Sequence, residues 1–268
     1  MTEINGKTVK LITHRLRKTA ETCPKHPKEH LVYLDGFKKM KPFCQSCQYE
    51  KNIAQEKQMV SDFKVDQMRG FLKAASLVDR QEAFNYRFDN FEAKSGSNEA
   101  KAKNDARLIA GYYLKYPNKK GNSLFYGNAG TGKTHLAMSI LNAVNDNANP
   151  MVRCLFISVN KLISEMRTWF QDGTGKWSPK GIIEVVHKSN LVVLDDLGAE
   201  SVNTQARSYV QEIILEIFES NQRIITTTNL SMDELYRTYH SRLVSRMQEG
   251  DRHKVIDFSK IEDKRSRL

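Results

Sequence analysis

The sequence lacks long apolar runs, an excess of acid and any abundance of cysteine, and each absence excludes a class of protein. No apolar stretch approaches the roughly 18 residues of a membrane span, so we expect no contact with a membrane. Residues Met1–Lys18 have no apolar stretch between their charges, which predicts no signal peptide and a cytoplasmic protein. Lys and Arg number 42 against 31 Asp and Glu, a net charge of +11, which excludes an acidic disordered chain. There is also no internal repeat or low-complexity tract.

The four cysteines of the 268 residues are expected to be metal ligands or core residues, because a cytoplasm keeps thiols reduced. Three of them lie in a CxxH pair, Cys23–His26, and a CxxC pair, Cys44–Cys47. Two such pairs can each supply two ligands to a tetrahedral Zn²⁺ ion. We therefore predict a zinc site made of Cys23, His26, Cys44 and Cys47. His30 and His14 remain alternatives to His26.

The amino-terminal region is more basic than the rest of the chain and differs from it in composition. Residues 1–80 carry 16 Lys and Arg but nine Asp and Glu, so +7 of the net charge lies there. An acidic protein surface and a nucleic acid are both suitable partners for such a module. Apolar residues at helical spacing predict a helix over residues 48–77. We expect a zinc-binding and helical domain over residues 1–80, a linker with the start of the next domain over 81–105, and that domain over 106–268.

Beyond residue 105, short apolar strands alternate with amphipathic helices, a pattern typical of an α/β fold with helices on both faces of a parallel sheet. The predicted strands are Ser123–Tyr126, Cys154–Val159, Leu191–Leu194, Arg223–Thr227 and His253–Phe258. The predicted helices are Lys133–Ala143, Asn160–Phe170, Thr204–Glu219 and Ser231–Tyr239, the last opened by a capping box. Cys154 lies in a strand and is expected to be a buried free thiol.

A glycine-rich loop, GNAGTGKT, follows the first of these strands and precedes a helix, which is the setting of a phosphate-binding P-loop. Its backbone N–H groups and the helix N-terminus can surround phosphate oxygens. Lys133 would reach the outer phosphates, and the Thr134 hydroxyl would bind Mg²⁺. The residues expected to bind ATP are Gly127, Asn128, Ala129, Gly130, Thr131, Gly132, Lys133, Thr134 and His135.

Two carboxylates end the apolar strand that begins at Leu191, where a parallel sheet binds its ligands. Asp195 is predicted to hold the Mg²⁺ ion, and Asp196 to orient and deprotonate the attacking water. Asp196 is one methylene shorter than the Glu that many such ATPases use. Asn229 ends the next strand and can bond the water or the γ-phosphate.

These features, together with Asp195–Gly198, Phe88–Phe91 and Arg242–Met247, resemble the AAA+ ATPases of the DnaC and DnaI type, which load bacterial replicative helicases. The resemblance covers about residues 84–268 and implies the P-loop AAA+ fold. It further implies that Arg246 is an arginine finger for a neighbouring subunit's ATP site, with Arg242 on the same face. Arg265 would touch the γ-phosphate of its own subunit. The active form would then be an oligomer, and a monomer would hydrolyse ATP slowly. The residues implied in catalysis are Lys133, Asp195, Asp196, Asn229, Arg246 and Arg265.

The resemblance also indicates partners. An amino-terminal zinc module is similar to that of DnaI-type loaders, in which this domain grips the hexameric helicase. We expect a bacterial cytoplasmic protein, encoded by a bacterium or by a phage, that uses ATP, Mg²⁺ and Zn²⁺ to load a helicase onto single-stranded DNA. One alternative is a transposition helper of the IstB type. Another is a zinc-dependent DNA-binding adaptor whose ATP site is regulatory.

Basic and aromatic residues interleave between the second and third strands, as in proteins that bind single strands by stacking and charge. These residues are Lys161, Arg167, Trp169, Phe170, Lys176, Trp177, Lys180 and Lys188. We expect Trp169 and Phe170 to pack in the core, residues 171–181 to form a loop, and Trp177 to contact DNA.

Overall fold

The computed structural model describes residues 2–4, 7–9, 16–35, 41–173, 177–198, 204–220, 223–249 and 254–263, and only the backbone at 2–4, 7–9 and 204–208. The chain forms two compact units, Met1–Lys64 and Val65–Leu268. A helix of 31 residues, α1 (Gln45–Ala75), begins in the first unit and ends in the second. Among the described helices, none is both long enough and apolar enough to cross a membrane.

The first unit contains two antiparallel strand pairs. β1 (Thr2–Ile4) pairs with β2 (Lys7–Val9), and β3 (Leu16–Thr22) pairs with β4 (His30–Leu34). Of the described side chains in this unit, those of Cys23, Val32 and Cys44 are buried and the rest are half-buried or exposed. Apolar burial alone therefore gives this unit little stability.

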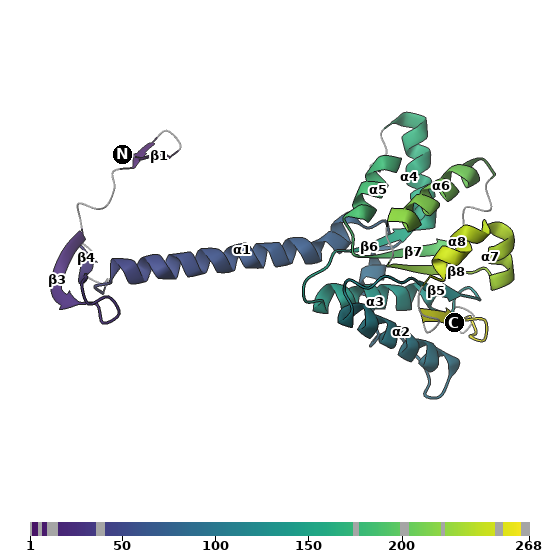
Figure 1. The fold of residues 1–268 in the computed structure, drawn as a ribbon, viewed down its shortest axis with the longest axis horizontal. Helices are drawn as coiled ribbons and strands as arrows, with labels where there is room; N and C mark the ends of the chain where they lie inside the picture. Colours follow the sequence, from purple (N-terminus) through teal and green to yellow (C-terminus); the bar gives the residue numbers. More distant parts are fainter. Residues whose placement is uncertain are drawn as a thin grey trace. The chain divides into compact units, whose positions relative to one another are not determined.

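The second unit is built on a five-stranded parallel sheet (Figure 1). Its strands are β5 (Ser123–Tyr126), β6 (Cys154–Ser158), β7 (Leu191–Leu197), β8 (Ile224–Thr228) and β9 (Val255–Asp257). Their order across the sheet is β6-β7-β8-β5-β9, with every neighbouring pair parallel. Leu77 forms a further parallel bridge with Ile157 of β6, so the chain that leaves α1 runs along the outer strand.

Helices cover both faces of this sheet (Figure 1). The described helical elements after α1 are η2 (Gln81–Asn85), α2 (Asn98–Lys115), α3 (Lys133–Asn147), α4 (Val159–Asp172), α5 (Pro179–His187), α6 (Thr204–Ser220), α7 (Met232–Thr238) and α8 (Ser241–Met247). Successive strand residues point to opposite faces. Phe156 therefore belongs to the core beneath α2 and α3, and Ile157 to the core beneath α4, α5 and α6.

The predicted strands and helices of residues 123–239 are all present, with ends that shift by a few residues, and the described part of the fifth strand is β9. The capping box of α7 is confirmed, with Glu234 N donating to Ser231 Oγ. Cys154 is fully buried, as predicted. Helix α5 is an addition within and after the expected loop, begun by Ser178, whose hydroxyl accepts from Gly181 N.

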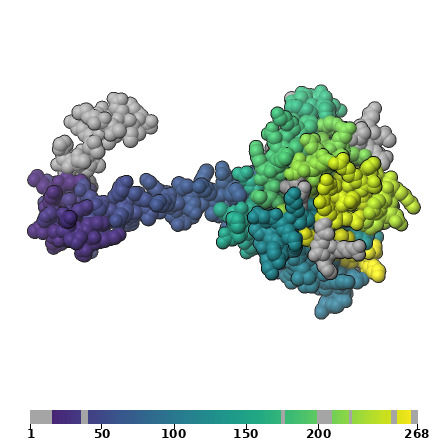
Figure 2. All heavy atoms as spheres, viewed as in Figure 1, coloured from purple at the N-terminus to yellow at the C-terminus, as the bar shows by residue number. Residues whose placement is uncertain are grey.

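Two connections join distant parts of the second unit. Asn98 Nδ2, at the start of α2, donates to Lys260 O at 3.1 Å, and these two regions are neighbours on the surface of the unit (Figure 2). Asn122 is buried just before β5, where its Nδ2 donates to Arg246 O at 2.6 Å and its Oδ1 accepts from Ile224 N at 2.8 Å. The end of α8 is thus tied to the beginnings of β5 and β8.

Candidate ATP-binding site and metal cluster

The P-loop connects β5 to α3, and its backbone requires glycine at two closely packed positions. Gly127 has φ +117°, and a Cβ there would lie 2.5 Å from Ser259 N. Gly132, the N-cap of α3, has φ +95°, and a Cβ there would lie 2.5 Å from the Phe91 ring. Lys133 is buried, and its Nζ donates to the carbonyl oxygens of Gly127 and Asn128 at 2.7 and 2.5 Å. The lysine cation is thereby held on the concave side of the loop.

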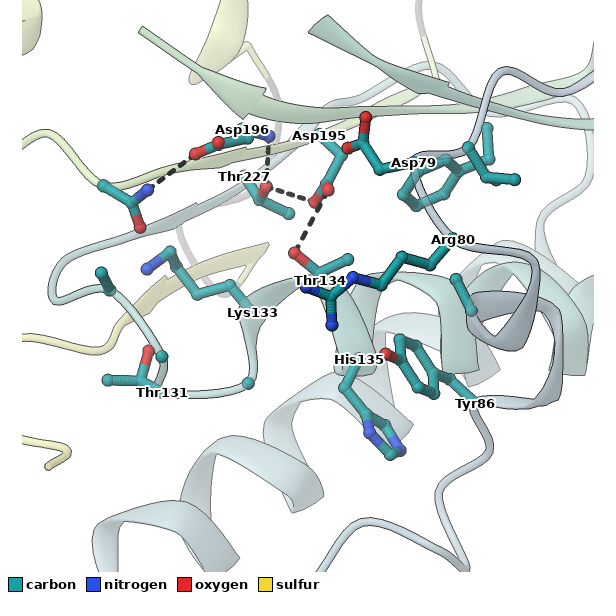
Figure 3. Close-up of a pocket in the computed structure, with 17 residues that line it drawn as sticks. Asp79, Arg80, Tyr86, Thr131, Lys133, Thr134, His135, Asp195, Asp196 and Thr227 are labelled. Carbon is teal, nitrogen blue, oxygen red and sulfur yellow. Dashed lines mark hydrogen bonds between the residues drawn. The ribbon is translucent and has the colours of Figure 1, made fainter. Parts of the chain in front are cut away.

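A cavity of about 510 Å³ lies against this loop at the carboxyl edge of the sheet (Figure 3). Its volume is in the range of small-molecule and cofactor sites. The predicted residues that line it are Ala129, Gly130, Thr131, Gly132, Lys133, Thr134, His135, Asp195, Asp196 and Asn229. Further residues that line it were not predicted: Val78, Asp79, Arg80, Ala83, Tyr86, Phe156 and Thr227.

Asp195 lies at the centre of a hydroxyl cluster. Its Oδ2 accepts from Thr134 Oγ1 at 3.2 Å and its Oδ1 from Thr227 Oγ1 at 2.6 Å. Burial raises the pKa of Asp195 to about 6; the hydroxyls of Thr227 and Thr134 oppose that rise, and the charges of Asp196 and Asp79 add to it. A carboxylate and a hydroxyl this close together are suitable oxygen ligands for Mg²⁺, which would offset the unfavourable negative charge.

Asp196 is held from three directions. Its backbone has φ +58°, in the left-handed region, and its N–H donates to Thr227 Oγ1 at 2.9 Å. Its Oδ1 accepts from Asn229 Nδ2 at 2.7 Å and its Oδ2 from Asn160 Nδ2 at 3.1 Å. Asn160 follows β6 as Asn229 follows β8. The position of Asn160 just after an apolar strand therefore indicates, from the sequence alone, that it lies at the same edge of the sheet as Asn229.

His135 and the aromatic residues before α2 form one wall of the site. The rings of His135 and Tyr86 are stacked, with centroids 4.4 Å apart and planes 8° apart, and Phe91 approaches His135 edge-on. His135 Nε2 lies 2.9 Å from Asn90 Oδ1 and 3.0 Å from Arg87 O. Both partners are acceptors, so Nε2 carries the proton, and the ring is fixed at the mouth of the P-loop.

The arginines assigned by resemblance lie away from this cavity. Arg246 Nη1 pairs with Glu249 at 2.8 Å, and this pairing raises the pKa of Arg246. Arg242 Nη2 pairs with Glu219 at 2.8 Å. Both arginines line a second cavity of about 560 Å³, so they share one surface as predicted. Arg265 lies outside the described residues.

In the first unit the two predicted ligand pairs come together. The ligand atoms of Cys23, His26, Cys44 and Cys47 all lie within 4.8 Å of one another. His26 Nδ1 is 3.3–3.8 Å from the three sulfurs, and the Cys23 and Cys47 sulfurs are 3.5 Å apart. Ligands about 2.0–2.3 Å from one Zn²⁺ ion would be separated by roughly these distances. The cluster fits a tetrahedral zinc site.

The surroundings of the cluster support that fit. Burial opposes ionisation of Cys23, but hydrogen bonds from His26 lower the pKa of its thiol to about 6, whereas the hydrogen bond with Cys23 and burial raise the pKa of Cys47 to about 12. In the absence of metal, the cluster therefore favours a thiolate at Cys23. His26 Nε2 lies 3.2 Å from Glu50 Oε1, a carboxylate that can orient a ligating imidazole. Of the alternatives, His30 lies on β4 and is exposed, and His14 lies outside the described residues.

One expectation for the basic and aromatic segment is wrong. Phe170 is 59% exposed and contacts Tyr209 edge-on. It has the helical spacing of the buried Ile163 and Met166 but lies in the last turn of α4, beyond the part of the helix that is buried. Trp169 is half-buried. Trp177, our candidate for a DNA contact, is half-buried and packs against the core beneath α4, α5 and α6. Lys176 lies outside the described residues.

The model of the bacterial DnaA ATPase domain matches residues 83–253, well over half of the chain. The chain belongs to the bacterial DnaA ATPase domain family. The matched part of this DnaA-type chain contains the P-loop, Asp195, Asp196, Asn229 and Arg246, and it begins after the cysteine cluster. Nucleotide and Mg²⁺ are the ligands that membership implies.

Sequence relatives of the chain include a helicase loader and an insertion-sequence protein. The replicative helicase loader DnaC of Escherichia coli K12 is 25% identical over 146 residues, 54% of this chain and 57% of that protein. The ATP-binding protein of insertion sequence IS5376 from Geobacillus stearothermophilus is 30% identical over 122 residues, 45% of each chain. The chain spans about half the length of the curated relatives that it matches.

Solved structures show the same fold. The DnaC helicase loader superposes with a TM-score of 0.53 at 23% identity, covering 68% of this chain and all of that one. DnaI superposes with a TM-score of 0.50 at 20% identity, covering 68% of this chain and 96% of that one. The predicted P-loop AAA+ fold and the resemblance to DnaC and DnaI are confirmed.

Proposed function

We propose that this protein is an ATP-dependent loader that places a hexameric replicative DNA helicase on single-stranded DNA. The observation that carries the proposal is the match to the loader DnaC in both sequence and fold over the ATPase unit. A replication role agrees with the DnaA-type domain. The P-loop, Asp195 and Asp196 line one cavity, which supports a role in binding and hydrolysing ATP.

The roles in hydrolysis follow from where charge develops. The loop amides and Lys133 bind the phosphates, and Thr134 and Asp195 would hold Mg²⁺, which neutralises phosphate charge when bound. Asp196 accepts the proton of the attacking water. Each Asp196 oxygen accepts one asparagine amide and keeps a second lone pair for the attacking water. Asn229 and Asn160 thus orient the carboxylate that accepts the proton.

We assign helicase binding to the amino-terminal unit. Its Cys23–Cys47 cluster would be ordered by zinc, and the +7 charge of residues 1–80 suits an acidic protein surface. The test is co-purification with the replicative helicase of the source organism. We expect a complex with the full chain, and loss of the complex for a Cys44→Ser variant that still binds ATP. Absence of any complex with the full chain would reject the loader.

Self-association is the second part of the proposal, because Arg246 is assigned to the ATP site of a neighbouring subunit. Arg246→Ala retains its own P-loop, and Lys133→Ala retains its own Arg246. Each variant alone is expected to hydrolyse ATP poorly. A mixture forms hybrid sites with both groups, so ATP turnover measured over a titration should rise above the sum of the two. A mixture no faster than that sum would exclude an arginine finger in trans.

A transposition helper of the IstB type is the second candidate, favoured by the 30% identity to the ATP-binding protein of an insertion sequence. The cysteine cluster favours the loader. Stimulation of turnover by duplex DNA in the absence of helicase, with no helicase complex, would favour the helper instead. A DNA-binding adaptor with a regulatory ATP site would show equal, negligible turnover in wild type and in an Asp196→Asn variant.

A further inference from the structure

The chain that leaves α1 becomes an extra edge of the sheet. Leu77 N donates to Phe156 O and Leu77 O accepts from Ser158 N, both at 2.8 Å. Phe156 N donates to the Ser76 hydroxyl at 2.8 Å. Leu77 and Val78 are buried. Residues 76–78 are therefore fixed beside β6, and the next two residues emerge at the carboxyl edge, where the nucleotide cavity lies.

The Asp79 side chain is held at this edge by a hydrogen bond. Its Oδ2 accepts from Ser158 Oγ at 2.6 Å, and the same hydroxyl accepts from Lys161 N at the start of α4. Ser158 is also the register partner of Asp195. Asp79 thus connects the segment after α1 to the strand end and the helix that border the Mg²⁺ ligands, and it fixes where the following residue begins.

Arg80 extends into the cavity. Its carbonyl accepts from Ala83 N at the start of η2, which orients its backbone. Its guanidinium makes no hydrogen bond or ion pair among the described residues, and Figure 3 shows it beside Thr134. The described lining holds three carboxylates, Asp79, Asp195 and Asp196, but only Lys133 and Arg80 as permanent cations. A free guanidinium at this place is a ready ligand for phosphate.

We propose that Arg80 binds the phosphates of the bound nucleotide, with Asp79 as its positioning residue, so that the nucleotide further stabilises the segment that directly continues α1. The inference rests on the proposed ATP binding and adds a ligand that lies outside the P-loop and outside the family match, which begins at residue 83. Its consequence is that the residue in contact with the phosphates lies only five residues after the end of α1.

The test compares ATP and ADP affinity by calorimetry in the full-length protein with Mg²⁺. Arg80→Ala is expected to weaken binding about tenfold, since a hydrogen bond to a charged group is lost. Arg80→Lys should keep part of the affinity. The matched control is Arg237→Ala, an exposed arginine of α7 away from the cavity. Because the Arg80 side chain has no described partner, Arg80→Ala should melt like wild type without nucleotide; if it does not fold, Arg80→Gln carries the same test.

Hydrogen exchange gives the second readout. At saturating ATP, amides of residues 76–86 should exchange more slowly than in the free wild type, and this protection should be reduced in Arg80→Ala at equal saturation. Wild-type affinity and protection in Arg80→Ala would overturn the inference while leaving ATP binding intact. If the wild-type protein itself does not bind ATP, the proposed function fails, and the role of Arg80 fails with it.

Discussion

The ATP site and the cysteine cluster are assembled in opposite ways. The ATP site draws its residues from the P-loop after β5, from β6, β7 and β8 and from the start of α3, and a sheet buried on both faces holds these elements in place. The cluster takes its four ligands from two short segments, in a unit whose described residues bury only Cys23, Val32 and Cys44. Apolar packing therefore forms the first site before any ligand arrives, whereas the second depends on its metal. The two units should respond differently to the same treatments.

The largest effect is expected from removing a metal ligand. Cys44→Ser should abolish stoichiometric zinc and unfold the described part of the first unit, since zinc binding supplies roughly 10 kcal/mol in comparable modules. ATP affinity should stay within about twofold of wild type, because its site lies in the other unit. Metal analysis, limited proteolysis and calorimetry measure the three effects. Cys154→Ala is the matched control: it removes a buried thiol of β6 and should leave zinc bound. Zinc retained by Cys44→Ser would disprove the ligand set.

Next in size is the effect of removing Asp196, the proposed catalytic base. Asp196→Asn should slow ATP hydrolysis at least about 100-fold, the usual contribution of a general base. Zinc content and ATP affinity should be unchanged. Asp233→Asn, an exposed carboxylate of α7, serves as the control. Turnover measured in the presence of helicase and DNA tests the prediction, and an undiminished rate would remove Asp196 from the mechanism.

A smaller effect concerns pH and the ligand-free ATP site. Burial raises the pKa of Asp195 to about 6 in the folded state, above its ordinary value of 3.8. The protonated form is thus favoured by folding, and the stability gained by protonation is lost as the pH rises through about 6. With EDTA present, Asp195→Asn should be more stable than wild type by roughly 1–3 kcal/mol at pH 8, and the difference should vanish near pH 4. Denaturant titrations at both pH values measure it. A constant difference would contradict the raised pKa.

The smallest effect is expected at the residue that orients His26. Glu50→Gln should weaken zinc binding about tenfold, at the low end for a partner of a ligating histidine because Glu50 is half exposed. Competition with a chelator measures the affinity. Glu56→Gln, an exposed carboxylate farther along α1, provides the comparison. Equal affinities for all three proteins would show that Glu50 does not act on the cluster.

The same contrast explains what could be predicted from the sequence. The P-loop, Asp195 and Asp196 are contiguous signals attached to apolar strands, so their meeting at one sheet edge follows from parallel pairing. Asn160 directly follows β6 and could have been predicted by the reasoning that identified Asn229. Thr227 is one of three consecutive threonines of β8, and the sequence does not distinguish it from its neighbours. Arg80 could not be predicted as a cavity residue, because its position depends on the backbone bridge between Leu77 and Ile157 of β6. No pattern of side chains in the sequence indicates that bridge. Phe170 was misplaced because helical spacing indicates the buried face of α4 but not the point along the helix at which the core ends.

The hydrogen bond between Asn122 and the Arg246 carbonyl has a consequence for motion in the proposed oligomer. Arg246, which we assign to a neighbour's ATP site, lies at the end of α8, and its carbonyl oxygen accepts from Asn122, whose side chain also accepts from Ile224 N at the start of β8. The far ends of β5 and β8 carry the P-loop and Asn229. A rotation of one subunit about its bound nucleotide is therefore expected to move its Arg246 as well, so that in the proposed oligomer the occupancy of one site would alter the geometry of the next.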